Sequence, residues 1–502
     1  MLSVWSIASV VPALVLCAAG LIYAIAQVLL LACASHRWVL LARWRALRAT
    51  AGPMKKTACV PAARDEETPI VTVQLPVFNE AVVVERAIDA VAALDHPRTH
   101  LEVQVLDDST DPDAVARAAR AVARHRAHGL DIVHLRREHR AGFKAGALAA
   151  GLTVARGTFV AVFDADFVPR PDFLLSVLPS FADSRVGMVQ AGWEHLNRDD
   201  GWLTAAQATL LDAHFALEHG TRAGGGLFFN FNGTAGVWRR TCIDDAGGWS
   251  AATLTEDLDL SYRAQLRGWR FAWCADVGVP AELPRTVGAL RSQQHRWALG
   301  SIQTARRLLP QVIAAPLPGR VKLEACFHLT SNVAYPLLLV LGLLLAPLLG
   351  VPPVGPRWLP WLLQGVVVLA GMVPVVLFLA AGRRARGATR RRAVRDAALA
   401  LVLGIGLSLA NTRAVLAGLA HDGGTFVRTP KSGDRPVPVR RGPRARRGRG
   451  ELALAAYFTT VAVVAIALGQ LRAVPFLALL VTGFGAVGLA EWSEPAGPRD
   501  AA

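Results

Sequence analysis

The chain has 502 residues, which is enough for one soluble domain together with several membrane-spanning helices. Its hydrophobic fraction of 53% and mean hydropathy of +0.35 argue against a purely soluble protein. The formal net charge of +16 raises nucleic acid as a partner, but much of the excess lies in two arginine clusters beside apolar segments, and no nucleic-acid-binding motif is present. The six cysteines lack metal-ligand spacing, which argues against a zinc site or a disulfide framework.

The first predicted element is a transmembrane helix over residues 1–36. Residues 1–35 contain no charged side chain, and a basic cluster begins at Arg37. Because cationic residues mark the cytoplasmic end of a span, we expect this helix to run from outside to inside. A cleaved signal peptide is the alternative, but no basic region precedes the apolar segment, and the segment is too long for one.

Residues 61–290 have the pattern of an α/β domain, in which short apolar runs alternate with segments typical of helices. The predicted strands cover residues 70–77, 102–106, 131–135 and 158–163. The predicted helices cover residues 80–93, 112–127, 143–155 and 171–182. This alternation predicts a mainly parallel sheet covered by helices on both faces, with ligands at the carboxyl ends of its strands.

Acidic residues follow three of these strands, namely Glu80, Asp107 with Asp108, and Asp164 with Asp166. A single acid at such a place usually caps a helix or forms a turn, but several of them, each after an apolar run, favour a shared site. Asp164 and Asp166 offer oxygen ligands for Mg²⁺ or Mn²⁺, and such an ion neutralises the diphosphate of a nucleotide. The pattern therefore predicts a metal and nucleotide site at this edge of the sheet.

Two further charged residues fit the same site. Lys144, flanked by Gly142 and Gly146, is placed to reach a phosphate, although an ordinary helix start explains it equally well. Asp257 is the candidate general base, a carboxylate that accepts the proton of an attacking hydroxyl. A helix start with Thr255 as its cap is the alternative for this segment, and the two interpretations are compatible.

Residues 291–322 mix basic and apolar side chains in a pattern that predicts an amphipathic helix on the membrane surface. Trp297 offers a flat face on which an acceptor sugar can stack, while Gln293 and Arg296 offer hydrogen-bond donors to a diphosphate or a polymer end. An interfacial Trp-Arg pair, which is common at membrane surfaces, is the alternative interpretation.

Apolar segments predict two transmembrane hairpins, over residues 323–382 and 451–491. Residues 394–419 form a shorter apolar segment with basic flanks, which predicts an interfacial helix with both ends in the cytoplasm. The basic segment 420–450 then lies in the cytoplasm as well. We expect a multi-pass protein of the inner or plasma membrane with about five crossings, an outside N-terminus and a cytoplasmic α/β domain. Six crossings, with one basic cluster outside, is the alternative.

The order of these motifs resembles the processive family 2 glycosyltransferases, the group of cellulose, chitin and hyaluronan synthases. The motifs are Asp107-Asp108, Asp164-Ala-Asp166, Thr255-Glu-Asp257 and Gln293-x-x-Arg296-Trp297. Phe231-Asn-Gly-Thr234 and residues 254–263 look like the cellulose synthase-like mannan and glucan backbone synthases. The resemblance covers roughly residues 10–490. It implies a GT-A-type α/β glycosyltransferase domain inserted in an α-helical transmembrane region, with about five spanning helices plus interfacial helices.

The resemblance also implies a role for each motif. The implied donor, metal and base residues are Glu80, Asp107, Asp108, Lys144 and Asp164 for the nucleotide sugar, Asp164 and Asp166 for the metal, and Asp257 for the proton. The implied acceptor residues are Phe231, Asn232, Gly233, Thr234, Glu256, Gln293, Arg296 and Trp297. Residues 426–431 resemble the gating loop of the family, in which Thr429 and Lys431 close over the donor diphosphate. Arg428 stands where the family often has valine.

The implied function is a processive inverting synthase that transfers hexose from UDP-glucose or GDP-mannose to a growing β-linked glucan or mannan and moves this polymer across the membrane. Membrane lipid and accessory secretion proteins are further expected partners, and nucleic acid is not expected. A non-processive transferase that adds one sugar to a lipid is the alternative, although Gln293-x-x-Arg296-Trp297 argues against it because this motif follows processive enzymes. A channel with a soluble regulatory domain is a third hypothesis, which donor turnover by the purified protein would exclude.

Overall fold

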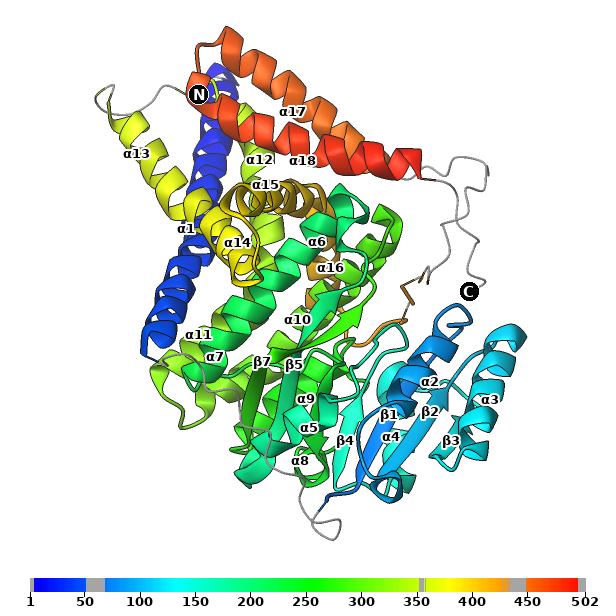
Figure 1. The fold of residues 1–502 in the computed structure, drawn as a ribbon. Helices are drawn as coiled ribbons and strands as arrows, with labels where there is room; N and C mark the ends of the chain where they lie inside the picture. Colours follow the sequence, from blue (N-terminus) through cyan, green and yellow to red (C-terminus); the bar gives the residue numbers. More distant parts are fainter. Residues whose placement is uncertain are drawn as a thin grey trace.

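The computed structural model places a helical layer on an α/β domain (Figure 1). The residues that it describes are 4–50, 68–351, 356, 358–426, 428, 429, 431, 433 and 448–494. Residues 51–67, which include the start of the domain predicted at 61–290, and most of the basic segment after residue 433 lie outside the described residues.

A seven-stranded sheet forms the centre of the α/β domain, in the order β3-β2-β1-β4-β6-β5-β7. The strands are β1 Val71–Val77, β2 Leu101–Asp107, β3 Asp131–Arg136, β4 Phe159–Val162, β5 Val186–His195, β6 Gly236–Arg239 and β7 Arg270–Ala281. Only β6 runs antiparallel to its neighbours, β4 and β5, in this described sheet. The mainly parallel sheet and its first four strands are therefore confirmed.

Helices cover both faces of the sheet. The described helices of the α/β domain are α2 Val84–Ala92, α3 Pro112–Ala127, α4 Phe143–Val154, α5 Phe173–Val177, α6 Trp202–Ala213, α7 Gly220–Gly224, α8 Arg240–Asp245 and α9 Glu256–Leu266. Residues of α2, α3 and α5 share one buried apolar cluster with the sheet, and residues of α4, α8 and α9 share another. The predicted helix at 112–127 has the observed bounds because Asp111 caps its N-terminus and Pro112 takes a first-turn position, where no amide partner is needed.

Short helical turns connect these elements. The 3-10 turns are Arg98–His100, Leu178–Ala182, Arg198–Asp200, Ser331–Val333 and Leu471–Ala473, and the π-helices are His214–His219 and Val368–Met372.

Five described helical segments are long and apolar enough to cross a membrane. They are Leu14–Ala49, Gly319–Leu348, Leu359–Ala385, Arg449–Ala467 and Leu471–Ser493. The helices that form them are α1 Val4–Thr50, α11 Gly319–Thr330, α12 Ala334–Leu348, α13 Leu359–Val367, α14 Val373–Ala385, α17 Arg449–Ala467 and α18 Val474–Ser493.

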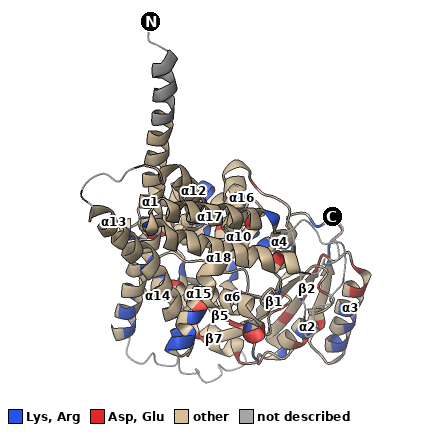
Figure 2. Cartoon of the chain, turned by 90° about the horizontal axis from the view of Figure 1, so that it is seen from above, with Lys and Arg blue, Asp and Glu red and all other residues tan. Residues whose placement is uncertain are grey.

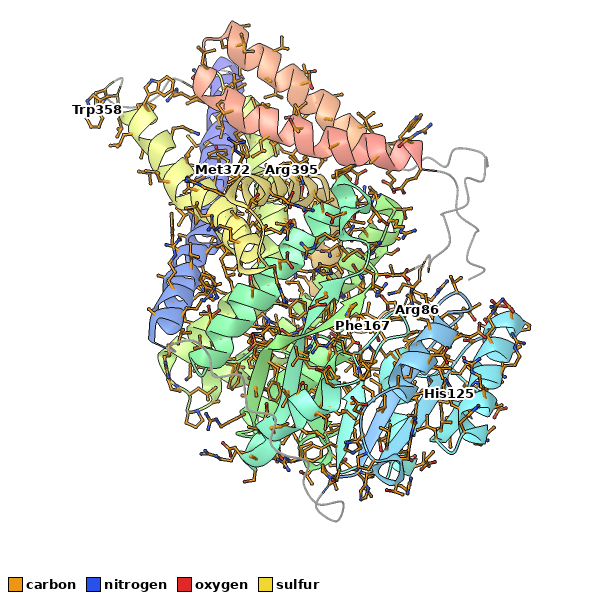
Figure 3. The ribbon with its side chains drawn as sticks, in the orientation of Figure 1. Arg86, His125, Phe167, Trp358, Met372 and Arg395 are labelled. Atoms are coloured by element: carbon orange, nitrogen blue, oxygen red, sulfur yellow. The ribbon has the colours of Figure 1, made fainter. Side chains whose placement is uncertain are left out.

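The outer surface of this helical layer has the character of a membrane-facing one. In Figure 2, α13 and the described N-terminal part of α1 carry no basic or acidic residue. Trp358 lies at the outer end of α13 (Figure 3), and the Trp358 and Trp361 side chains are 62% and 61% exposed. Large aromatic side chains are left exposed in this way where lipid replaces water.

The segment predicted as an interfacial helix consists of two helices, α15 Arg390–Gly406 and α16 Ser408–Ala420, which meet at 53°. Counted as one bent span, this pair would raise the number of crossings to six. α15 packs on α6, α14 and α18, and α16 packs on α10 and α12. Both helices therefore have protein neighbours on several sides.

α10, Val287–Ala314, differs from the one-sided surface helix that its sequence suggests. Residues 298–305 of this helix are buried without interruption. α9, α11 and α16 pack around these turns, and α18 contacts the N-terminal turns of α10, where Arg291 pairs with Glu491. The sequence pattern of α10 alone does not reveal these neighbours. In its middle turns, α10 is therefore a buried helix that contacts both the α/β domain and the membrane helices.

Candidate active site

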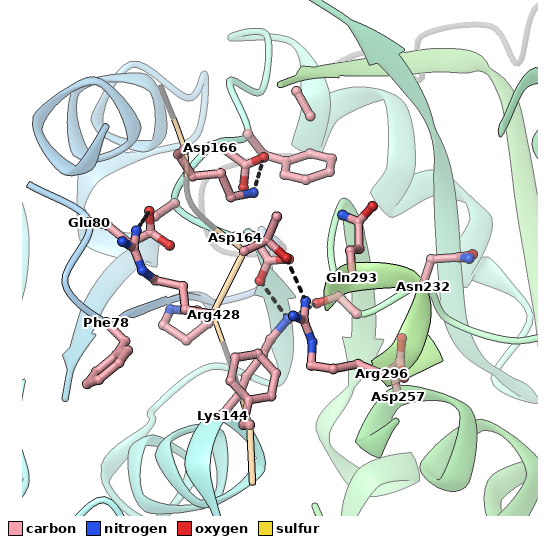
Figure 4. Close-up of a pocket in the computed structure, with 18 of the residues that line it drawn as sticks. Phe78, Glu80, Lys144, Asp164, Asp166, Asn232, Asp257, Gln293, Arg296 and Arg428 are labelled. Atoms are coloured by element: carbon pink, nitrogen blue, oxygen red, sulfur yellow. Dashed lines mark hydrogen bonds and ion pairs between the residues drawn. The ribbon is translucent and has the colours of Figure 1, made fainter. Parts of the chain in front are cut away.

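A cavity of about 180 Å³ opens at the carboxyl edge of the parallel strands, between the α/β domain and α10 (Figure 4). Since β1, β2 and β4 are parallel neighbours, the residues that follow them meet at this edge. The predicted residues that line the cavity are Glu80, Asp108, Lys144, Asp164, Asp166, Asn232, Gly233, Glu256, Asp257, Gln293, Arg296, Trp297, Thr429 and Lys431.

Three of the predicted residues lie behind the cavity wall. The Asp107 carboxylate is buried against His134, whose Nε2 is 2.8 Å from Asp107 Oδ2. Phe231 is fully buried and packs edge-to-face on Trp238. Thr234 Oγ1 accepts a hydrogen bond from the Asp164 amide at 2.9 Å. Asp107 and Thr234 therefore support the site from behind, and Phe231 belongs to the core.

Each carboxylate of the predicted metal site contacts a lysine. Lys144 Nζ lies 2.5 Å from Asp164 Oδ1 and donates to the Gly233 carbonyl at 2.9 Å. Lys431 Nζ lies 2.5 Å from Asp166 Oδ2. Among the described residues, no group of three acidic, histidine or cysteine side chains is arranged to hold a metal. The two aspartates nevertheless supply hard oxygen ligands, which fit Mg²⁺ or Mn²⁺ when phosphate oxygens complete the coordination.

Asp257 occupies the first turn of α9, inside the cavity. Its Oδ1 accepts a hydrogen bond from the Leu258 amide at 2.8 Å. Burial, followed by repulsion from the neighbouring Glu256 carboxylate, raises the Asp257 pKa to about 7. A carboxylate with this pKa can exchange protons near neutral pH, as a general base must. α9 also begins here as the alternative expects, with Thr255 at the N-cap position and Glu256 and Asp257 in the first turn, although the Thr255 side chain makes no capping hydrogen bond.

α10 approaches this acidic turn closely and brings its own side chains into the cavity. A Cβ on Gly300 would lie 2.6 Å from Thr255 Cγ2 and 2.8 Å from the Thr255 amide, so glycine permits the contact. One to two turns earlier, α10 presents Gln293, Arg296 and Trp297 to the cavity. Arg296 and Trp297 lie three and four residues after Gln293, so all three side chains share one face of the helix.

The described residues of the segment 426–431 fold over the cavity. Arg296 Nη2 donates to Thr429 Oγ1 at 3.0 Å, and the Arg296 guanidinium lies 4.7 Å from the Phe426 ring centre. Arg428 forms an ion pair with Glu80 at 3.2 Å. Burial is the main cause that raises the Glu80 pKa to about 7, partly offset by Lys431 and Arg428. Arginine at position 428 therefore contributes a contact to the cavity wall.

The cavity also contains residues that sequence reasoning missed. Trp193 and His195 come from the end of β5, and the Trp193 ring centre lies 6.4 Å from that of Trp297. Phe78 and Arg140 lie at the other side, with the guanidinium 3.4 Å from the ring centre. Phe78 and Arg140 lie two and four residues before the predicted Glu80 and Lys144, so these neighbours were a usable signal. No predicted site residue lies near Trp193 and His195 in the sequence, and these two join the site only through folding.

Backbone strain gives an independent indication of a functional site. Among the described residues, the non-glycine residues with positive φ are Asn79, Phe143 and Ala235, at 55°, 49° and 55°. Asn79 lies between two cavity residues, Phe143 precedes Lys144, and Ala235 lies two residues after Gly233. Such conformations cost free energy and tend to cluster at functional sites.

Comparison with known proteins identifies the family of the chain. Residues 69–300 match the family described as "Glycosyltransferase like family 2". Glucomannan 4-beta-mannosyltransferase 7 of Arabidopsis thaliana is 33% identical over 443 residues, which is 84% of this chain and 77% of that protein. Glucomannan 4-beta-mannosyltransferase 1 of Oryza sativa subsp. japonica is 42% identical over 272 residues, or 52% of each chain. The chain thus spans about half the length of some curated relatives that it matches.

A solved structure supports the fold. Mannosyltransferase PcManGT from Pyrobaculum calidifontis, in complex with GDP-Man and Mn²⁺, superposes with a TM-score of 0.50 at 21% identity, covering 78% of this chain and 99% of that one. The GT-A-type α/β domain with about five candidate spans is therefore confirmed. The chain belongs to glycosyltransferase family 2, in the cellulose synthase-like group that includes the glucomannan 4-beta-mannosyltransferases.

Proposed function

We propose that this protein is a membrane-embedded inverting hexosyltransferase that builds a β-linked polysaccharide from a nucleotide sugar and passes the polymer through its own helices. The observation that carries the proposal is that the Asp257 carboxylate, the Asp164 and Asp166 pair and the Trp297 ring line one cavity beside the membrane helices. The relatives' names favour mannose as the transferred sugar, and GDP-mannose is accordingly the first donor to test. UDP-glucose remains the alternative donor.

Asp257 is the proposed general base. Its carboxylate takes the proton of the acceptor hydroxyl while that hydroxyl attacks the anomeric carbon, and the nucleoside diphosphate leaves from the opposite side. One displacement of this kind inverts the anomeric centre and needs a single base. The raised Asp257 pKa supports this role because the group can be ionised at neutral pH and still accept a proton.

Asp164 and Asp166 are the proposed ligands of a divalent cation, either Mg²⁺ or Mn²⁺. Such an ion supplies charge neutralisation at the leaving diphosphate when it is bound. Lys144 and Lys431, which now contact the two carboxylates, are within the same cavity and supply further positive charge to the diphosphate. Glu80 and Asp108 complete the donor side, where Asp108 is held by a double contact from Arg137.

The acceptor is proposed to lie on the other side of the cavity. Trp297 and Trp193 provide aromatic faces for sugar rings there, and Gln293 and Asn232 provide polar atoms. Glu256 and Gly233 lie next to Asp257 and close the acceptor side around the base. A cytoplasmic α/β domain and an inner or plasma membrane location complete the proposal.

The decisive experiment is a panel of radiolabelled nucleotide sugars given to the purified protein in lipid nanodiscs, with linkage-specific digestion of the product. The expected result is a long polymer made from GDP-mannose that β-mannanase cleaves to short oligosaccharides. A glycolipid carrying one sugar would replace the processive function by the non-processive alternative. No transfer from any donor would refute the enzyme assignment and favour a channel with a soluble domain.

A further inference from the structure

A chain of polar contacts runs from the acceptor side of the cavity to the first membrane helix. Asn232 lines the cavity, and its side-chain Nδ2 lies 3.0 Å from His214 Nε2. His214 Nδ1 lies 3.0 Å from Glu218 Oε2. Glu218 in turn forms ion pairs with Arg37 of α1 and with Arg222, the latter at 3.3 Å.

The charges in this chain fix the direction of each hydrogen bond. Burial alone would raise the Glu218 pKa, but Arg37 and Arg222 outweigh it and hold the pKa well below its usual range. An ionised Glu218 accepts only, so the proton of this hydrogen bond lies on His214 Nδ1. His214 Nε2 is then an acceptor and takes its hydrogen bond from the Asn232 amide group.

This arrangement leaves Asn232 Oδ1 available to accept a hydrogen bond from a ligand. Asn232 Oδ1 is buried and has no hydrogen-bond partner among the residues that the structure describes. A buried amide oxygen without a partner costs free energy, and a ligand that donates a hydrogen bond removes that cost. A sugar hydroxyl is such a donor, and the acceptor side of the cavity is where Asn232 lies.

The helix that carries His214 restricts the rotation of the His214 ring. His214–His219 is a π-helix, a rare element that is often associated with functional sites. The His214 ring packs against the Phe215 and His219 rings, with centres 5.1 and 4.4 Å away. Rotation of His214 away from Asn232 would break both ring contacts and both hydrogen bonds.

We propose that His214 and Glu218 are positioning residues, which hold the Asn232 amide so that its Oδ1 accepts a hydrogen bond from a hydroxyl of the acceptor sugar. Arg37 ties this arrangement to α1, so the first membrane helix helps to set the acceptor site. The inference deepens the proposed function and rests on it, because it requires a sugar acceptor on this side of the cavity.

The test compares His214→Leu with His214→Gln in the full-length protein in nanodiscs, with GDP-mannose as donor and β-1,4-linked mannotetraose as acceptor. Leucine loses both hydrogen bonds, so the acceptor KM is expected to rise about five- to tenfold while the donor KM stays within about twofold. Glutamine can donate to Glu218 and accept from Asn232, so it is expected to restore the acceptor KM. A purely structural role would not separate the two KM values or favour glutamine.

A double-mutant comparison completes the design. Asn232→Ala is expected to raise the acceptor KM as much as His214→Leu, and the double variant is expected to add nothing, because both changes remove one interaction. An unchanged acceptor KM in Asn232→Ala, or equal impairment by leucine and glutamine, would overturn the proposal. The Asn232→Ala result decides the question even when His214→Leu fails to fold. Absence of transfer by the unmodified protein would instead refute the proposed function.

Discussion

Replacing Asp257 by asparagine is expected to abolish sugar transfer while donor binding persists. Asparagine has nearly the same shape, and its oxygen can still accept the hydrogen bond that the Leu258 amide donates at 2.8 Å. It cannot accept the proton of the attacking hydroxyl. Removal of a general base costs a factor of about 10² to 10⁴ in kcat, which corresponds to about 3–5 kcal/mol of transition-state stabilisation.

The same carboxylate sets the expected pH dependence of the unmodified protein. Burial and the Glu256 charge raise the Asp257 pKa to about 7, and only the ionised form can act as the base. Activity is therefore expected to be level above about pH 8 and to fall about tenfold for each pH unit below about pH 6. An aspartate with an ordinary pKa would place this fall near pH 4 instead.

Both expectations are measured on one set of samples. Initial rates with saturating donor, taken from about pH 5 to pH 9, give the apparent pKa. Calorimetry measures donor binding by the variant, and retained binding shows that the variant is folded. Asp244→Asn, at an exposed acid of α8, serves as the matched control. Substantial transfer by Asp257→Asn would refute the base assignment, and a level profile down to about pH 5 would refute the raised pKa of Asp257.

Three further predictions concern the walls of the cavity. Lys431→Met removes a charged contact to the proposed diphosphate site and is expected to raise the donor KM about tenfold, measured by steady-state kinetics. Trp297→Ala is expected to shorten the polymer, measured by gel filtration of the product, whereas Trp297→Phe retains a stacking face and is expected to keep most of its length. Gly300→Ala places a Cβ against Thr255 and is expected to cost about 1–3 kcal/mol and to lower kcat, measured by thermal unfolding and kinetics. Gly404→Ala on α15 meets open space and is the control expected to change neither value.

Local patterns predicted the elements that local physics determines. The first four strands were predictable because each is an apolar run bounded by polar residues, and the helix at 112–127 because Asp111 and Pro112 define its start. The acids after β1, β2 and β4 were predictable as one site because parallel neighbouring strands bring their carboxyl ends together.

Features that depend on long-range packing were not predictable. Asp107 and Asp108 are adjacent at the end of an extended strand, so their side chains point to opposite sides, and the sequence does not say which one faces the cavity. Asp108 lines it, whereas Asp107 contacts His134 of β3. Phe231 belongs to a motif but faces the core, because Trp238 of β6 lies behind it. The enclosure of α10 likewise depends on helices far away in the sequence.

The charge balance of the cavity suggests how donor and metal bind. Lys144 and Lys431 each neutralise one carboxylate of the proposed metal pair, and both lysines have little exposed surface. A divalent cation that entered alone would add two positive charges beside two buried ammonium groups, which is electrostatically unfavourable. The diphosphate of a nucleotide sugar brings the compensating negative charge and gives both lysines new oxygen partners. Ion and donor are therefore expected to bind together, and the segment with Lys431 is expected to exchange its contact with Asp166 for one with the donor.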